Sequence, residues 1–225
     1  MLEILYRSGG LVVVDKPTNV SLLADRSGAE SVWDTLPAML GAKPYLVHRL
    51  DKGTSGVLLI ALDQATQRQL TRAFQQRRVR KFYLAQVVGA PAGRGTRTVD
   101  LPLKKGRKSR YRVAGQRDDI RFHTGRWSLA RDPGDGHPSQ TRFRVLREGE
   151  GRSWLLAAPV TGRTHQLRVH LAWIGHPITG DHLYGRPRDP AQRAPRLMLH
   201  CHRLTVPGYG SFTAPPEPDL DFSSP

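Results

Sequence analysis

The apolar residues of this 225-residue chain occur only in short runs, and this limits what the chain can fold into. The longest runs are Leu11–Val14 and Gly56–Leu62, far below the roughly 20 residues that a membrane-spanning helix needs. The first ten residues mix Glu3 and Arg7 with single apolar residues, unlike a secretory signal peptide. The length still allows a sizeable core. We therefore expect a soluble, cytoplasmic protein that has no membrane partner.

Strand and helix patterns are interspersed along the chain. Apolar runs and periodicity predict two strands within 2–15, the second at 11–14, and further strands at 57–62, 81–88, 141–145 and 154–159. They also predict helices at 30–40, 63–76 and 164–174. Asp63 is the expected N-cap of the second helix. Because the order lacks a strict βαβ rhythm, the fold class is predicted to be α+β. We expect a single domain over residues 1–213 and a disordered, Pro-rich acidic tail over 214–225.

Positive charge is concentrated in one part of the chain. The formal net charge is +16, and residues 64–112 hold fourteen Lys and Arg against one acid, Asp100. Such a field attracts a polyanion, and nucleic acid is the commonest one. The alternative is a solvated basic surface without a partner. Within this segment, residues 101–114 are so basic that we expect them to form an exposed hairpin or arm.

The residues that bind metals most often give no site pattern here. The single cysteine, Cys201, excludes an internal disulfide and a zinc site with several Cys ligands. His165 and His170 are five positions apart on a predicted helix, whereas zinc-binding helices use a spacing of four. We therefore expect no metal site.

Asp51 and Arg168 are the first candidates for chemistry. Asp51 lies in a turn directly before the buried run 57–62, which would fix its carboxylate at the mouth of a cleft. Arg168 lies about 60° from Leu171 on a helical wheel, so it can reach inward while its helix packs on the core. An arginine beside an aspartate keeps the carboxylate ionised, and a single aspartate so placed suits nucleophilic attack.

Three segments together resemble the RluA-type RNA pseudouridine synthases. They are HRLDKGTSGVLLIA (48–61), KFYLAQV (81–87) and GRTHQLRVHLAWIGHPITGD (162–181). The resemblance implies a catalytic domain with a mixed, mainly antiparallel sheet flanked by helices around a central RNA-binding cleft. The separate N-terminal RNA-binding module of many relatives is not expected, because the resemblance begins near Met1.

The same resemblance implies roles for individual residues. Asp51 matches the essential aspartate that acts in breaking the uridine glycosidic bond, as a nucleophile or through a glycal route. Tyr83 matches the tyrosine that lies against the base and is implicated in removing the carbon-5 proton. Arg168 matches the basic residue paired with the aspartate, and Arg49 an arginine that holds the flipped nucleotide. The basic arm departs from the plainer loop expected of this family, and its RNA-binding candidates are Lys104, Lys105, Arg107 and Lys108.

The implied reaction is an isomerisation that conserves every atom, so no metal, nucleotide or redox cofactor is expected. The implied partner is RNA, as a structured stem-loop of tRNA or large-subunit rRNA, and no obligate protein partner is evident. A flipped base must first leave its stack, at a cost of a few kcal/mol.

Two other functions remain open from the sequence. One is a metal-free endoribonuclease that uses paired histidines such as His48 and His165 as acid and base. The other is a non-catalytic RNA-binding protein that keeps the fold. Strand scission would distinguish the first, and loss of Asp51 would indicate the second.

Overall fold

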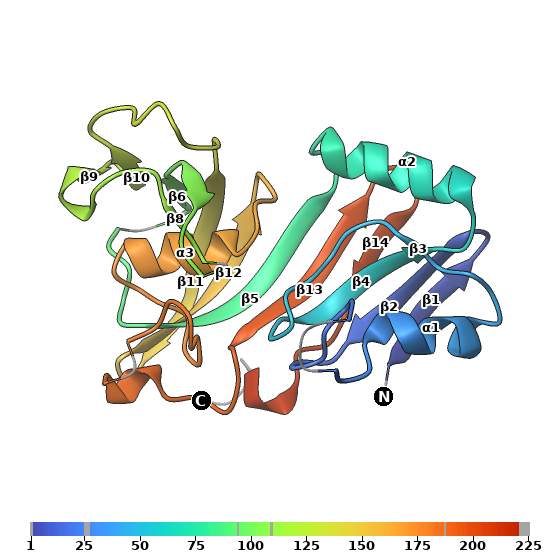
Figure 1. Cartoon of the computed structure of the whole chain (residues 1–225). Helices are drawn as coiled ribbons and strands as arrows, with labels where there is room; N and C mark the ends of the chain where they lie inside the picture. Colours follow the sequence, from blue (N-terminus) through green and yellow to red (C-terminus); the bar gives the residue numbers. More distant parts are fainter. Residues whose placement is uncertain (1, 25–27, 94, 109, 187, 221–225) are drawn as a thin grey trace. The chain divides into compact units, whose positions relative to one another are not determined.

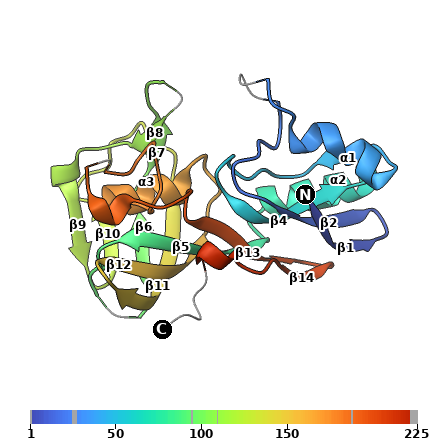
Figure 2. The ribbon, with the colours of Figure 1, turned by 90° about the horizontal axis from the view of Figure 1, so that it is seen from below.

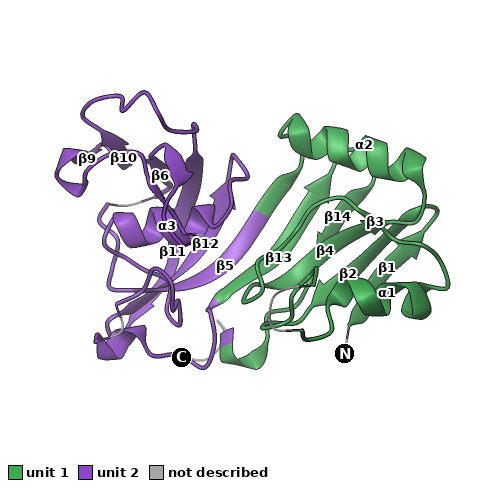
Figure 3. Ribbon diagram, viewed as in Figure 1, with its two compact units in different colours: residues 1–81, 199–219 green, residues 82–198, 220–225 purple. Residues whose placement is uncertain are grey.

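The structure is a computed structural model that describes residues 2–24, 28–93, 95–108, 110–186 and 188–220. It contains two compact units, coloured separately in Figure 3. The first unit comprises residues 1–81 and 199–219, and the second comprises residues 82–198 and 220–225. Residues 1–213, expected to form a single domain, therefore contribute to both units.

The first unit is built on strands paired in the order β1–β2–β4–β13, with β3 added to β4 and β14 added to β13. Their bounds are Glu3–Ser8 (β1), Leu11–Lys16 (β2), Tyr45–Leu46 (β3), Ser55–Ala61 (β4), Leu199–Val206 (β13) and Gly210–Thr213 (β14). β4 is buried along its whole length and β2 nearly so, which makes this antiparallel pair the core. β13 runs parallel to β4. The two strands predicted within 2–15 and the strand predicted at 57–62 are confirmed.

Two helices cover one face of this sheet. α1 (Val32–Leu40) and α2 (Gln64–Gln75) lie on the same side of β1, β2 and β4 (Figure 1, Figure 2). α2 begins after Asp63 as predicted, because the Asp63 carboxylate accepts a hydrogen bond from the N–H of Thr66 at 2.7 Å. α1 continues through Pro37 and ends at Gly41, whose N–H donates to the Pro37 carbonyl.

The second unit contains a sheet of strands in the order β5–β12–β11–β6–β10–β9. Their bounds are Arg80–Val88 (β5), Arg97–Asp100 (β6), Ile120–His123 (β9), Arg126–Leu129 (β10), Gln140–Gly149 (β11) and Arg152–Pro159 (β12). Neighbours are antiparallel except β10 and β6. The strands predicted at 81–88, 141–145 and 154–159 are confirmed. The sequence does not predict β6, β9 and β10, which have four residues each and are too short to show a clear alternation.

The basic stretch 101–114 forms the predicted hairpin. β7 (Leu103–Lys105) and β8 (Tyr111–Val113) pair antiparallel, with Lys105 opposite Tyr111. The base of the hairpin is buried at Leu103 and Val113, whereas most of the described residues of its tip are exposed.

α3 (Gln166–Trp173), within the predicted helix 164–174, contacts β8, β11 and β12. The sequence predicts a narrow apolar face, but the structure buries the helix on almost all sides, including Gln166, Arg168 and His170. These polar side chains are buried because each has partners. The His170 Nε2–H donates to the Leu101 carbonyl at 2.9 Å, and Nδ1 lies 3.0 Å from the Thr141 hydroxyl.

Short 3₁₀ helices at Arg117–Asp119 (η1), Pro190–Gln192 (η2) and Pro218–Leu220 (η3) complete the described elements. η3 falls in the stretch expected to be a disordered tail, and it differs from that expectation. Ala214 and Leu220 are buried, and the Ala214 carbonyl accepts a hydrogen bond from His202 Nδ1 at 2.9 Å. Residues 221–225 of the expected tail lie outside the described residues.

The predicted α+β class is confirmed: the strands are mixed and mainly antiparallel, and α-helices pack on them. Within the described ranges, no helix is long and apolar enough to cross a membrane.

His170 should make the stability of the protein depend on pH. Burial lowers the pKa of its imidazole from the ordinary 6.5 to about 4. Below pH 6.5 the unfolded chain therefore binds a proton that the folded chain does not, so the free energy of unfolding should fall as the pH drops from 6.5 to 4. This group alone should contribute a loss of up to about 3 kcal/mol.

The measurement is urea unfolding between pH 7.5 and pH 4.5 for the wild type and His170→Gln. We expect the variant to be less stable at pH 7.5 and to lose about 1 kcal/mol less per pH unit on acidification. Comparing the two proteins cancels the contribution of other titrating groups. Identical pH slopes would show that His170 does not carry this dependence.

Candidate functional site

Asp51 lies in a tight turn that leads directly into β4, as the sequence predicts. The Asp51 carbonyl accepts a hydrogen bond from the N–H of Thr54 at 3.0 Å. The Thr18 hydroxyl donates to the Gly53 carbonyl at 2.9 Å, which attaches the turn to the loop after β2. Asp51 is partly exposed, and every residue from Thr54 to Ile60 is buried. The turn therefore fixes Asp51 at the solvent-accessible end of a rigid, buried strand.

A buried lysine holds the same turn. Lys16, the last residue of β2, has no exposed surface, and its Nζ donates to the carbonyls of Pro17, Val20 and Lys52 at 2.7, 2.9 and 3.3 Å. All three ammonium hydrogens thus have an acceptor. Burial lowers the pKa of Lys16 to about 8, and the charge of Asp51 opposes this fall. The ammonium therefore stays protonated at neutral pH.

Gly56 allows β4 to lie close to β13 directly after the turn. Its φ of 108° is in the region that favours glycine, and a Cβ there would lie 2.3 Å from the Cys201 carbonyl oxygen. Cys201 is fully buried on β13, as expected for a small filling residue. A side chain at position 56 would push β4 away from β13 and displace Asp51.

Arg49 and His48 precede Asp51 and differ in their surroundings. Arg49 is exposed, and its side chain makes no hydrogen bond or ion pair within the described part of the chain. His48 Nε2 accepts the N–H of Leu59 at 2.9 Å, and its ring stacks on Phe74. Desolvation lowers the pKa of His48 to about 3. His48 is therefore a neutral structural residue at neutral pH, which argues against the acid–base role that an endoribonuclease would require.

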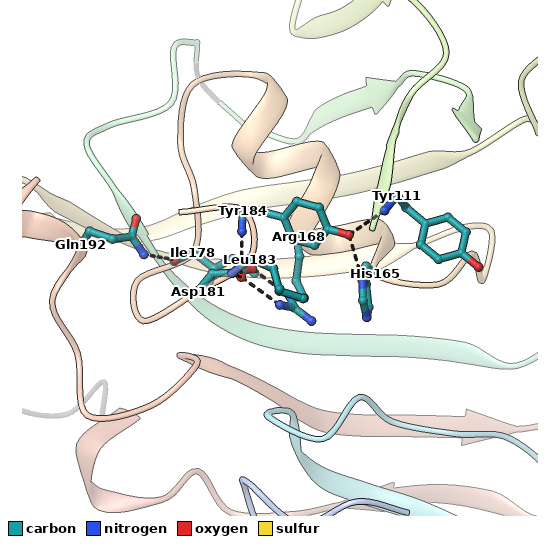
Figure 4. A network of polar contacts seen from close by, with 8 residues as sticks. All are labelled: Tyr111, His165, Arg168, Ile178, Asp181, Leu183, Tyr184 and Gln192. Atoms are coloured by element: carbon teal, nitrogen blue, oxygen red, sulfur yellow. Dashed lines mark hydrogen bonds and ion pairs between the residues drawn. The ribbon is translucent and has the colours of Figure 1, made fainter. Parts of the chain in front are cut away.

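In the second unit, Arg168 is held by an aspartate that is not among the candidates predicted from the sequence. Figure 4 shows the contact between α3 and the loop that follows it. Arg168 Nε and Nη2 donate to Asp181 Oδ2 and Oδ1, both at 2.8 Å, and the two side chains are only 9% and 1% exposed. A bidentate pair of this kind fixes the plane of the guanidinium. Arg168 therefore reaches inward, as the helical wheel predicts.

The loop around Asp181 is itself tightly fixed. Asp181 Oδ1 also accepts the N–H groups of Leu183 and Tyr184 at 2.9 and 3.1 Å. Gly180 has a φ of 73°, and a Cβ there would lie 1.7 Å from the Arg196 carbonyl oxygen. The Gln192 amide of η2 donates to the Ile178 carbonyl at 2.6 Å. The backbone therefore sets the position of Asp181, and Asp181 sets that of Arg168.

Tyr184 extends this network to the hairpin. Its ring lies 5.2 Å from the Arg168 guanidinium carbon, a cation–π contact. Its hydroxyl accepts the N–H of Tyr111 on β8 at 2.9 Å and lies 2.9 Å from His165 Nδ1. His165, directly before α3, has a φ of 56°, a strained value for a residue with a side chain.

Tyr83 and the basic arm complete the candidates of the second unit. Tyr83 lies on β5 opposite Ala157 of β12 and is partly exposed, whereas the next residue, Leu84, is buried. In the arm, Lys104 Nζ forms an ion pair with Asp135 at 2.6 Å, which satisfies part of its charge. The other three RNA-binding candidates of the arm, Lys105, Arg107 and Lys108, are exposed.

The structure thus brings the candidates together in two groups. Asp51 and Arg49 belong to the first unit with Lys16, and Tyr83, Arg168 and the arm belong to the second. Lys16, Asp181 and Tyr184 are not identified as site residues by the sequence patterns alone. Lys16 follows the apolar run 11–14 after one residue, Asp15, and its alternation with Val12 and Val14 could have identified it as a buried charge. Among the described residues, no three His, Cys, Asp or Glu side chains are grouped so that they could hold a metal ion.

Comparison with known proteins relates this geometry to one group of enzymes. A family model described as RNA pseudouridylate synthase matches residues 10–173. The dual-specificity RNA pseudouridine synthase RluA of Escherichia coli is 36% identical over 223 residues, covering 95% of this chain and 93% of that protein. The ribosomal large subunit pseudouridine synthase C of Vibrio parahaemolyticus is 32% identical, covering 89% of this chain and 60% of that protein.

Solved structures agree with these relatives. Human RNA pseudouridylate synthase domain containing 1 is 30% identical, with a TM-score of 0.77, covering 98% of this chain and 86% of that one. Human RNA pseudouridylate synthase domain containing 4 is 26% identical, with a TM-score of 0.78 and coverage of 97% and 90%.

Removing the Lys16 ammonium should loosen the Asp51 turn. Lys16→Met keeps the approximate length of the side chain but removes the ammonium. The carbonyls of Pro17, Val20 and Lys52 then lose their hydrogen-bond donor. We expect the free energy of unfolding to fall by about 1–3 kcal/mol. Amide hydrogen exchange at Thr54, whose N–H closes the turn, should become faster than exchange in the middle of β4.

Lys43→Met is the matched control, because it removes an exposed ammonium from the same unit and leaves untouched the three carbonyls that Lys16 uses. It should leave both the stability and the Thr54 exchange nearly unchanged. Equal effects of the two substitutions would mean that the buried hydrogen bonds do not hold the turn.

Proposed function

The chain belongs to the RNA pseudouridine synthase family, and we propose that Asp51 breaks the glycosidic bond of its target uridine with help from Tyr83 and Arg168. The protein is an isomerase that converts uridine in RNA to pseudouridine. The observation that carries the catalytic proposal is the turn of Asp51, fixed at the end of β4 by Lys16 and Thr18. A carboxylate in a preorganised turn suits attack at a defined sugar atom.

In the proposed reaction, the target nucleotide first leaves its stack so that its sugar becomes accessible. The carboxylate of Asp51 then acts in breaking the bond between C1′ and N1, as a nucleophile or through a glycal route. The freed uracil keeps the electron pair of the broken bond, rotates and rejoins the sugar through carbon 5, releasing Asp51 from the sugar where a covalent bond had formed. The hydrogen on carbon 5 leaves as a proton and N1 takes up a proton, so the product is an isomer of uridine. We assign Tyr83 to the face of the base and to removal of this proton.

Arg168 has the chemistry of a charge-stabilising residue. Its guanidinium keeps its positive charge even when buried, because Asp181 satisfies it through two hydrogen bonds. We propose that it stabilises the charge that develops in the transition state. Arg49, which is exposed, is assigned to holding the extruded nucleotide.

The proposed substrate is a structured stem-loop in tRNA or large-subunit rRNA, processed in the cytoplasm. One relative is described as dual-specificity and another as acting on the large ribosomal subunit, and the second description supports an rRNA target. We propose that the hairpin tip binds phosphates through Lys105, Arg107 and Lys108, because these cations are exposed. Lys104 contributes less, since Asp135 already pairs with it.

Asp51→Asn should abolish pseudouridine formation while the fold and RNA affinity remain. Asparagine has the same shape but lacks the charge and nucleophilicity of the carboxylate. The assay is tritium release from RNA that carries 5-tritiated uridine, because rejoining through carbon 5 expels that hydrogen. RNA affinity should stay the same or rise slightly, since a negative charge near the phosphates is removed.

Asp63→Asn is the matched control, because it makes the same change in the same unit at a position where asparagine also caps a helix. It should keep the wild-type rate. Tritium release by Asp51→Asn at more than a few per cent of the wild-type rate would remove Asp51 from the mechanism.

The contribution of the arm should appear in the salt dependence of RNA binding. Each phosphate contact contributes a slope of roughly −0.7 to −0.9 in log K against log salt. Changing Lys104, Lys105, Arg107 and Lys108 to Gln together should flatten the slope by about two to three units. Lys104→Gln alone should change it less than Lys105→Gln alone, because of Asp135. An unchanged slope in the fourfold variant would mean that the arm does not bind RNA.

A further inference from the structure

Tyr184 lies where the basic hairpin, α3 and the loop of Asp181 meet. Its ring contacts the Arg168 guanidinium, and its hydroxyl is bonded to the backbone of the hairpin at Tyr111 and lies beside His165. None of the three motif segments includes Tyr184, which follows the last of them by three residues. One side chain thus contacts both the catalytic arginine and the element that we assign to RNA binding.

The hairpin end of this connection is close to the exposed cations. Tyr111 pairs with Lys105 at the last rung of the β7–β8 ladder, and the tip that follows carries Arg107, Lys108 and Arg110. The Gly106 N–H donates to the Arg110 carbonyl at 2.8 Å, which closes the tip. A phosphate bound at the tip would therefore restrain the backbone of Tyr111, and with it the N–H that the Tyr184 hydroxyl accepts.

Tyr184 is also connected to Arg168 through direct contacts. Asp181 fixes the plane of the guanidinium through its two oxygens, and the same Oδ1 accepts the N–H of Tyr184. The aromatic ring then limits movement of the guanidinium out of that plane. His165 packs edge-on against both rings, at 5.6 Å from Tyr184 and 5.9 Å from Tyr111. The three aromatic side chains form one packed cluster between the hairpin and α3.

We propose that Tyr184 is a positioning residue that sets Arg168 for the reaction when RNA engages the β7–β8 hairpin. The inference rests on the proposed function, in which Arg168 is catalytic and the hairpin binds RNA. It goes beyond that function because it makes the rate of the chemical step depend on a contact remote from the uridine. Tyr184 itself touches neither the base nor the sugar in this proposal.

Two variants separate the parts of the side chain. Tyr184→Phe keeps the ring over Arg168 and removes the hydroxyl, whereas Tyr184→Leu removes both. At saturating RNA, we expect the single-turnover rate to fall about tenfold in Tyr184→Phe and about a hundredfold in Tyr184→Leu. The dissociation constant for RNA should change by less than about twofold in both. A merely structural residue would instead lower the melting temperature and impair binding and rate together.

Tyr209→Phe is the matched control, because it removes a tyrosine hydroxyl that donates to Gln69 at 2.7 Å in the first unit. It should keep the wild-type rate. If Tyr184→Phe did not fold, His165→Asn would test the same cluster, since asparagine tolerates the left-handed backbone at that position. That variant should also lose rate severalfold with unchanged affinity.

A double-mutant cycle tests the link to the hairpin itself. Changing Arg107, Lys108 and Arg110 to Gln should weaken RNA binding equally in the wild type and in Tyr184→Phe. At saturating RNA, the same change should slow the wild type about fivefold and slow Tyr184→Phe no further, because the link is already broken. Equal slowing in both backgrounds, or a wild-type rate in Tyr184→Phe, would overturn the proposal.

Arg168→Met, measured alongside, keeps this result distinct from a failure of the proposed function. Loss of turnover in Arg168→Met together with full activity in Tyr184→Phe would refute only the role of Tyr184. Full activity in Arg168→Met would refute the catalytic role on which both proposals depend.

Discussion

The position of Asp51 depends on the hydrogen bonds that one buried ammonium donates to three backbone carbonyls. A lysine is costly to bury unless its charge and its three donors are satisfied. Lys16 meets this requirement with Pro17 and Val20 from the loop after β2 and Lys52 from the turn of Asp51. The need to satisfy one cation therefore ties two segments together. These hydrogen bonds go to backbone carbonyls, so they require no polar side chain on β4. The strand can therefore consist almost wholly of apolar residues and still have a carboxylate just before its first residue.

The second unit solves a similar problem with a different cation. The guanidinium of Arg168 has donors in a fixed plane, so a single carboxylate, Asp181, satisfies two of them and sets its orientation. Lysine donates in three directions and is suited to gathering carbonyls, whereas arginine is suited to pairing with a carboxylate. Each unit therefore fixes its charged group through its own contacts. In the reaction that we propose, groups fixed in this way would require little reorganisation, which is the condition for strong electrostatic stabilisation of a transition state.

Local sequence patterns predict the strands and helices that are marked by apolar residues or by a capping residue. β2 and β4 follow from their apolar runs, and α2 follows from its apolar periodicity and from the N-cap at Asp63. β6, β9 and β10 do not follow, because four residues are too few to show a period. The residues of the candidate site also differ in whether a local sequence pattern predicts them. The motif and the turn predict Asp51, but the role of Lys16 depends on a contact with a residue 36 positions away, which no local window contains.

α3 shows why burial of a polar helix cannot be read from a helical wheel. The wheel assigns Arg168 to the edge of an apolar face, yet both Arg168 and His170 are buried, and only one of them is charged at neutral pH. The difference comes from their partners. Arg168 pairs with a carboxylate, whose negative charge stabilises a cation. His170 instead contacts a carbonyl and a hydroxyl, which are uncharged and form hydrogen bonds with a neutral imidazole. These partners come from distant strands and loops, so tertiary structure decides that the buried part of this helix presents one fixed positive charge rather than two.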